Sequence, residues 1–204
     1  MIAVLDYGIG NVSSISNMLK KIGAANSITA NPEVIKNASK LILPGVGHFD
    51  YCMKQLRNAP FFDLLQKRVF NDKIQILGVC VGCQMLMEKS EEGSEKGLGW
   101  IDGEVVKFDQ KRLPANFRIP HMDWTDVKPT GNSPLYDNIE EPRFYFVHSY
   151  HLQCNNLNNI TATANYGYEF PASIIRDNIM GVQFHPEKSH KYGMNLYNNF
   201  VNNF

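Results

Sequence analysis

The chain has 204 residues, 44% of them hydrophobic, and its 20 basic side chains equal its 20 acidic side chains in number. This length and composition predict one domain, residues 1–204, with a sizeable core. The balanced charge provides no global field for nucleic acid or an anionic membrane. Residues 1–5 lack the basic flank and length of a signal sequence, and no apolar run reaches membrane-spanning length, so we expect a cytoplasmic protein.

Strands and helices alternate through the first half of the chain. Residues 2–5 form an apolar run typical of a buried strand, and apolar residues then recur at helical spacing through 12–22. Residues 40–43 and 74–79 are two more apolar runs, each leading into a glycine-rich turn. This alternation predicts parallel βαβ units.

After Gly99 the pattern changes to shorter strands separated by turn residues. Asp177 and Asn178 predict a tight hairpin turn, and residues 191–204 predict a closing helix. The strands expected in this half centre on Val105, Val127, Phe144, Leu152, Thr161, Ser173 and Val182. We therefore predict an α/β fold with a mostly parallel central sheet flanked by helices, to which the second half adds antiparallel strands.

A cysteine stands at the end of the strand predicted over residues 74–79. Cys80 has a glycine two residues away on each side, Gly78 and Gly82, and the run 84–87 that follows predicts a helix. Small neighbours permit the strained turn of a nucleophile elbow, and a helix N-terminus favours a thiolate. The alternative is a cysteine packed in a buried strand. The remaining cysteines lack paired zinc-ligand spacing and are expected to be thiols: Cys52, Cys83 and Cys154.

A base and a carboxylate stand two residues apart near the end of the chain. His185 could take a proton from a thiol and return it to a leaving amine, while Glu187 would fix the imidazole tautomer. Cys80, Gly47, Asn11 and His185 all follow predicted strands. Because sites of open α/β sheets collect at the carboxyl ends of the strands, one cleft could hold all of them.

Together these motifs resemble class I glutamine amidotransferases, whose glutaminase domains carry Gly-x-Cys-x-Gly and a late His-Pro-Glu in this order. Residues 6–11, 43–49 and 145–150 extend the resemblance to the glutaminase subunits of imidazole glycerol phosphate synthases. The resemblance covers the whole chain and implies a flavodoxin-like strand order. It also implies that Cys80, His185 and Glu187 form a triad that hydrolyses glutamine to glutamate and ammonia, with no metal or cofactor.

The resemblance assigns donors to the oxyanion that would form when the thiolate attacks the amide. The backbone N–H of Val81 supplies one donor, and the turn around Val46 and Gly47 supplies the second. Gly45 and Gly47 flank Val46, so its peptide could rotate into or out of the donating orientation. The alternative is an ordinary glycine-rich turn between a strand and a helix.

The amino-acid end of glutamine needs acceptors for its ammonium group and donors for its carboxylate. By resemblance, Gln84 contacts the substrate, and Glu92 faces the α-ammonium. The same resemblance places His148, Ser149 and Tyr150 along the carboxylate side. Each has an ordinary alternative, such as a helix-surface amide, a loop charge or strand packing.

No phosphate-binding or dinucleotide-binding motif that could use the ammonia occurs in the sequence. The resemblance implies a TIM-barrel cyclase as heterodimer partner, which receives the ammonia and forms imidazole glycerol phosphate and aminoimidazole carboxamide ribotide in histidine biosynthesis. Asn11, Trp124, Tyr145 and Lys188 fall at positions facing that partner. Trp124 could instead be a core residue, and Tyr145 an ordinary strand residue.

Three residues depart from the pattern of the histidine pathway. Asp123 and Thr125 stand where those subunits usually have Gly and Asn, and Cys83 stands where Met is common. With residues 187–193, these features resemble paralogues that act with a cyclase-like barrel to make amidine-bearing surface sugars. A catalytically silent binding subunit and a stand-alone cysteine hydrolase are further alternatives, although a silent subunit would not need a complete triad.

Overall fold

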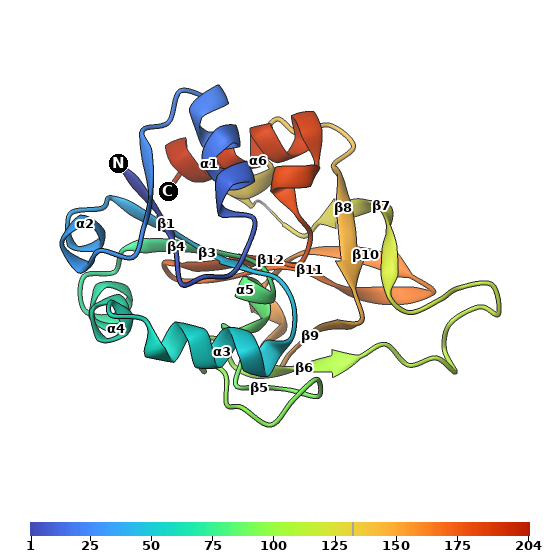
Figure 1. Cartoon of the computed structure of the whole chain (residues 1–204). Coiled ribbons are helices and arrows are strands. Elements are labelled where there is room, and N and C mark those ends of the chain that lie inside the picture. The colour runs from blue at the N-terminus through green and yellow to red at the C-terminus, as the bar shows by residue number, and fades with distance from the viewer. Residues whose placement is uncertain (132) are drawn as a thin grey trace.

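The computed structural model describes residues 1–131 and 133–204, and its strands form two sheets (Figure 1). Within these residues the larger sheet has nine strands in the order β2-β1-β3-β4-β12-β11-β10-β7-β8, and the smaller has the order β5-β6-β9. The strands of the large sheet are β1 (Ile2–Leu5), β2 (Asn26–Thr29), β3 (Lys40–Gly45), β4 (Gln75–Cys80), β7 (His121–Pro129), β8 (Arg143–His148), β10 (Ile160–Tyr166), β11 (Tyr168–Arg176) and β12 (Ile179–Val182). Those of the small sheet are β5 (Lys89–Ser90), β6 (Gly103–Lys107) and β9 (Tyr150–Cys154).

One half of the large sheet is parallel. Strands β2, β1, β3, β4 and β12 pair side by side in the same direction, in the flavodoxin-like order that the resemblance implies. Helices α1 and α6 lie next to each other over one face, while α3 and α4 lie on the opposite face (Figure 1). Because helices cover both faces, β1 and β12 are buried along their whole length, which explains their continuous apolar runs.

The other half of the large sheet is antiparallel and is made by β11, β10, β7 and β8. The predicted turn at residues 177–178 is confirmed, since Arg176 pairs with Ile179 and Asp177 has a φ of 54°. The α/β class is confirmed as well. The antiparallel part nearly equals the parallel part, however, so the sheet is more evenly mixed than we expected.

The predicted helices are present with one difference in length. The helices are α1 (Val12–Lys21), α2 (Pro32–Lys36), α3 (Phe49–Asn58), α4 (Phe62–Phe70), α5 (Val81–Gln84) and α6 (His190–Asn202). The helix expected to run on past Cys80 ends after one turn, at Gln84. None of the helices in the described part of the chain combines the length and apolarity that crossing a bilayer requires.

Aromatic side chains pack where the two halves of the sheet meet. The rings of Phe144 on β8 and Phe184 after β12 stack with their centres 3.9 Å apart. Phe146 and Phe170 pack edge to face nearby, with their ring centres 5.8 Å apart. This packing fixes β8 relative to the segment after β12, and both border the cleft described next, β8 through Val147 and His148 and the segment after β12 through His185.

Candidate active site

The turn between β4 and α5 places Cys80 at the carboxyl edge of the sheet. Cys80 has a φ of 55° and a ψ of −115°, so the cysteine itself, rather than a glycine, takes the strained conformation of a nucleophile elbow. Gly78 and Gly82 do not have a positive φ. A Cβ atom on Gly82 would lie 2.0 Å from the Leu43 carbonyl oxygen. The glycines are therefore needed for close packing, not for the turn conformation that we expected them to permit.

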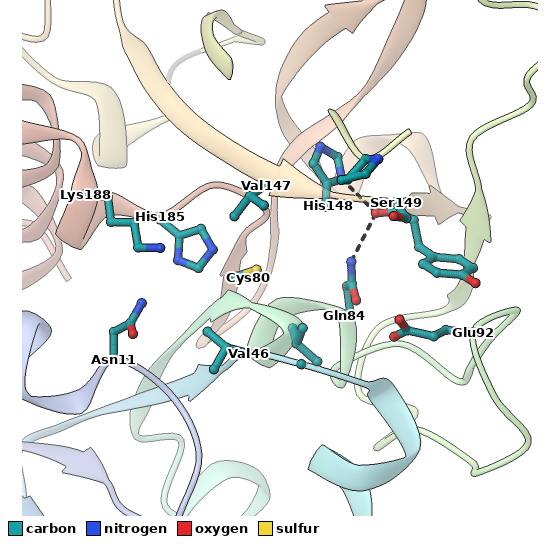
Figure 2. Close-up of a pocket in the computed structure, with 14 residues that line it drawn as sticks. Asn11, Val46, Cys80, Gln84, Glu92, Val147, His148, Ser149, His185 and Lys188 are labelled. Carbon is teal, nitrogen blue, oxygen red and sulfur yellow. Dashed lines mark hydrogen bonds between the residues drawn. The ribbon is translucent and has the colours of Figure 1, made fainter. Parts of the chain in front are cut away.

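His185 lies beside Cys80 in a cleft of about 480 Å³ (Figure 2). Its Nδ1 atom is 2.7 Å from Oε1 of Glu187, and the Asn11 amide donates to the same oxygen at 2.9 Å. Because a carboxylate only accepts, the proton lies on Nδ1, and Nε2 is left for the thiol. The side chains of His185 and Glu187 are 2% and 1% exposed, so water does not compete for their hydrogen bond.

The charges of the three residues support one another. Burial acts to lower the pKa of His185, but neighbouring Cys80 and Glu187 outweigh it and raise the pKa to about 10. Burial acts to raise the pKa of Glu187, yet hydrogen bonds from His185 and Asn11 hold it below its ordinary value. The site therefore favours a protonated imidazole between the Glu187 carboxylate and Cys80.

The predicted oxyanion donors border this cleft. Val81 is the first residue of α5, so its N–H is one of the donors that a helix leaves without an internal partner. Val46 and Gly47 line the same cleft, and Gly47 has a φ of 98°, which glycine adopts readily. Backbone N–H groups are thus available on two sides of Cys80.

Two buried side chains hold the end of β3 just before this turn. The Tyr7 hydroxyl donates to the Pro44 carbonyl, and the Cys52 thiol donates to the Val46 carbonyl with an Sγ–O distance of 3.4 Å. Burial and the neighbouring Cys80 raise the pKa of Cys52 to about 12, so this thiol keeps its proton and can donate. The Val46 carbonyl therefore has a partner inside the protein, which the sequence did not reveal.

Gln84 is buried behind the nucleophile and is not a helix-surface amide. Its Nε2 atom donates to the Tyr150 carbonyl at 3.1 Å and to Gln183 Oε1 at 3.0 Å. Its amide oxygen is left for a ligand, and Gln84 lines the cleft (Figure 2).

His148 and Ser149 line the side of the cleft opposite Val46 (Figure 2), and Tyr150 lines the same cleft. The ring of His148 has no nitrogen left for a ligand, because Nδ1 lies 2.7 Å from the Tyr150 carbonyl and Nε2 lies 2.9 Å from His121 Nδ1. Only Ser149 and Tyr150 of this trio therefore keep side-chain groups that could face a substrate.

Glu92 lies at the far end of the cleft from His185 (Figure 2). Its Oε2 atom accepts a hydrogen bond of 2.8 Å from the backbone N–H of Phe49, the first residue of α3. A helix N-terminus stabilises a negative charge, so the cleft has a fixed carboxylate at this end.

The sequence matches the family described as "Glutamine amidotransferase class-I" over residues 3–204. The chain belongs to the class I glutamine amidotransferases. It is 52% identical over 202 residues to the protein named imidazole glycerol phosphate synthase subunit HisH 2 of Methanococcus maripaludis. It is 48% identical to the protein of the same name from Pseudomonas aeruginosa, and each match covers 98% of both chains.

Solved structures agree with this family at the level of the fold. A crystal structure described as glutamine amidotransferase superimposes with a TM-score of 0.74 at 19% identity, covering 98% of this chain and 96% of the other. The PurLQS structure from Thermotoga maritima also gives 0.74, at 18% identity and with coverages of 99% and 97%.

The four residues predicted to face a partner are divided between two places in this amidotransferase. Asn11 and Lys188 line the cleft, while Trp124 and Tyr145 pair across β7 and β8 beside it. Trp124 is half-buried and stacks on His190, with ring centres 5.5 Å apart, so it is not a core residue. The exposed Lys188 ammonium lies 5.7 Å from the centre of the Tyr145 ring.

Tyr145 also anchors His185, the predicted catalytic base. Its backbone carbonyl accepts the N–H of His185 at 2.9 Å, and its N–H donates to the Ser189 hydroxyl at 3.0 Å. Tyr145 on β8 is thus hydrogen-bonded directly to the segment that carries His185 and Glu187.

A chain of hydrogen bonds that could not be read from the sequence links β7, β8 and β9 in the amidotransferase. Because the Tyr150 carbonyl only accepts, His148 is protonated on Nδ1 and accepts at Nε2 from His121 Nδ1. His121 Nε2 then accepts from the Thr125 hydroxyl at 2.8 Å. Thr125, one of the residues that depart from the histidine-pathway pattern, is therefore linked through two neutral rings to the strand that lines the cleft.

Proposed function

We propose that this amidotransferase is the glutaminase subunit of an imidazole glycerol phosphate synthase and supplies ammonia to a TIM-barrel cyclase. The proposal is carried by the hydrogen bond between His185 and Glu187, which joins a base to an orienting acid next to Cys80 in the cleft. The pathway is supported by full-length relatives at 45–52% identity that carry the name of this synthase subunit.

In the proposed reaction the Cys80 thiolate attacks the side-chain amide carbon of glutamine. The carbonyl oxygen becomes an oxyanion, which accepts hydrogen bonds from the N–H of Val81 and from the turn at Val46 and Gly47. Loss of one such donor typically costs about 10²–10³ in rate. Protonated His185 gives its proton to the nitrogen as the C–N bond breaks, and ammonia leaves. His185 then takes a proton from water, which cleaves the thioester and releases glutamate.

Substrate selection in this proposal depends on the two ends of the cleft. The ionised Glu92 pairs with the α-ammonium of glutamine, and Gln84 offers its amide oxygen nearby. The segment of Ser149 and Tyr150 lines the carboxylate side. A substrate held in this way places its side-chain amide toward Cys80.

The released ammonia must be transferred without entering water, where it would be protonated and lose its nucleophilicity. We propose that the barrel docks over Asn11, Trp124, Tyr145 and Lys188. The support is that Asn11 bonds Glu187 and that Tyr145 bonds the backbone of His185, so contact at this surface acts on the triad.

A second candidate shares the glutaminase chemistry but differs in the acceptor. Asp123 and Thr125 lie next to Trp124 on β7, at the proposed docking surface, and both depart from the histidine-pathway pattern. A partner that makes an amidine on a surface sugar would account for these two changes beside Trp124, whereas the third, Cys83, is buried in α5.

Reconstitution with each type of barrel tests both candidates. The chain is combined with an imidazole glycerol phosphate cyclase or with a cyclase-like barrel of a surface-sugar pathway, each with its acceptor, and glutamate and nitrogen-containing product are measured. We expect one partner to stimulate glutamine hydrolysis and to yield product in equal amount. No stimulation by either partner would contradict the proposal. Hydrolysis at the same rate without a partner would favour a stand-alone hydrolase, and no hydrolysis at all would favour a silent subunit.

A further inference from the structure

The loop that carries Glu92 has no helix or strand of its own between residues 91 and 97. It lies against the N-terminal end of α3, and Glu92 is joined to that helix by the N–H of Phe49 at 2.8 Å. No other hydrogen bond to the Glu92 carboxylate occurs among the described residues, so Oε1 remains available for a ligand. The position of Glu92 therefore depends on what holds the rest of its loop.

Asp50, the second residue of α3, holds this loop through its backbone. One carboxylate oxygen accepts the N–H of Glu95 at 2.9 Å, and the other accepts the N–H of Ser94 at 3.0 Å. The Ser94 hydroxyl lies 3.4 Å from the same oxygen. The bond from Ser94 lowers the pKa of Asp50, so the carboxylate stays ionised and accepts at neutral pH.

Gly93 shows how closely the two segments fit. A Cβ atom at Gly93 would lie 1.9 Å from Oδ1 of Asp50, and the φ of Gly93 is not in the left-handed region. The glycine is therefore required by the approach of the Asp50 carboxylate, not by the backbone conformation of the loop.

The same face of α3 continues the contact with the loop. Lys54 and Arg57 follow Asp50 at helical spacing, and both pair with Glu95, at 3.7 Å and 2.7 Å respectively. The two ion pairs are partly exposed and contribute little, and the backbone contacts of Arg57 are to the carbonyls of Lys96 and Gly97, at the end of the loop. Asp50 instead accepts from the N–H groups of Ser94 and Glu95, closer to Glu92. Asp50 is thus the residue of α3 that holds the part of the loop next to Glu92.

We infer that Asp50 is a positioning residue that sets the preference of the cleft for substrates with an α-ammonium group. This inference rests on the proposed function, in which Glu92 pairs with that group of glutamine. Without Asp50, the backbone at residues 93–95 loses its acceptors, and the Glu92 carboxylate is no longer held at one distance from the α-carbon of the substrate. The reacting groups at Cys80 lie at the other end of the cleft and keep their own supports.

The test compares glutamine with 4-carbamoylbutanoate, the same molecule without its α-amino group, in the amidotransferase bound to its barrel partner. For Asp50→Ala we expect a KM for glutamine about tenfold higher with a kcat within about twofold. Because the analogue cannot pair with Glu92, its kcat/KM should hardly change, so the preference for glutamine should fall about tenfold. Gly93→Ala should produce the same pattern from the loop side, and its result stands if Asp50→Ala does not fold.

Two further variants separate the possible failures. Asp63→Ala, which removes a first-turn carboxylate from α4, should leave the preference unchanged. Glu92→Gln should lose the preference at least as strongly as Asp50→Ala. If Glu92→Gln keeps the preference, the assignment of Glu92 in the proposed function is wrong. If Glu92→Gln loses it while Asp50→Ala and Gly93→Ala keep it, or lower kcat/KM equally for both substrates, the positioning role of Asp50 is overturned.

Discussion

The parallel and antiparallel halves of the large sheet contribute to the cleft in different ways. In the parallel half, β1, β3, β4 and β12 all end at one edge, and the segments after them bring Asn11, Val46, Cys80 and His185 together. The direction of the strands alone brings these residues to one edge of the sheet, because parallel strands place all their carboxyl ends on the same side. The groups that would react with glutamine come from this half.

In the antiparallel half, the alternation of side chains along the strands matters more than where the strands end. Along β8, Phe144, Phe146 and His148 are buried in the core, while Tyr145 and Val147 are only partly buried on the other face. One strand thus provides core packing, the support of His185 and part of the cleft wall. The parallel half therefore supplies the groups predicted to react, whereas the antiparallel half holds the cleft in place and carries Trp124 and Tyr145 of the proposed docking surface.

The largest effect should come from the nucleophile of the parallel half. Cys80→Ala should lower glutamine-dependent turnover by about 10⁵-fold or more, because loss of a triad nucleophile removes covalent catalysis. Activity of the complex with added ammonium salt should be kept, since the proposed acceptor chemistry lies on the partner. Both activities are measured on one preparation of the complex. Loss of the ammonium-dependent activity in an assembled complex would contradict this division of labour.

The orienting acid of the same half should matter less than the nucleophile. Glu187→Gln keeps the size of the side chain but places an amide against His185, which favours the wrong tautomer and removes a charge. We expect kcat to fall by about 10³–10⁴ with little change in KM. Steady-state kinetics of the complex measures both constants. A loss in KM alone would mean that Glu187 acts in binding and not on the imidazole.

Two buried histidines of the antiparallel half should make the stability of the protein depend on pH under mildly acid conditions. Burial lowers the pKa of His121 from 6.5 to about 4 and also lowers that of His148. The unfolded chain then binds more protons than the folded one, so stability should fall as the pH drops from about 6.5 towards 4. For His121 the shift corresponds to about 3 kcal/mol.

Urea unfolding between pH 4 and pH 7 measures the slope of the free energy of unfolding against pH. His121→Phe should flatten it, although stability at pH 7 also falls because His148 and Thr125 lose a hydrogen-bond partner. The matched control is Phe170→Leu, which removes an aromatic ring from the same cluster without removing a titratable group. It should lower stability equally at all pH values. An unchanged dependence on pH in His121→Phe would mean that His121 does not titrate as its burial predicts.

The two halves also differ in how far the sequence predicted them. Apolar runs and motifs predicted the parallel strands, the elbow at Cys80 and the order of the triad residues. The residues that follow parallel strands meet at one edge of the sheet, whatever segments connect the strands. The sequence could not reveal that Cys52 bonds the Val46 carbonyl or that His121 bonds His148. Such contacts join residues distant along the chain and depend on side-chain packing, and no local sequence pattern marks them.

The smallest effect on activity should come from substitution of Lys188, at the surface where the two halves meet. The exposed Lys188 contacts the ring of Tyr145 from β8 and follows the triad of the parallel half directly. Lys188→Ala should leave folding and the alkylation rate of Cys80 unchanged but should release ammonia in excess over product, by a few-fold, once the partner is bound.

The matched control is Lys191→Ala, since the ammonium of the exposed Lys191 lies 5.0 Å from the ring centre of Tyr192 in a comparable cation–π pair. Because single exposed cation–π pairs contribute only about 0.5–1 kcal/mol, neither variant should be much less stable than the parent. Glutamate and product are measured together, and an unchanged ratio with unchanged partner affinity would remove Lys188 from the docking surface.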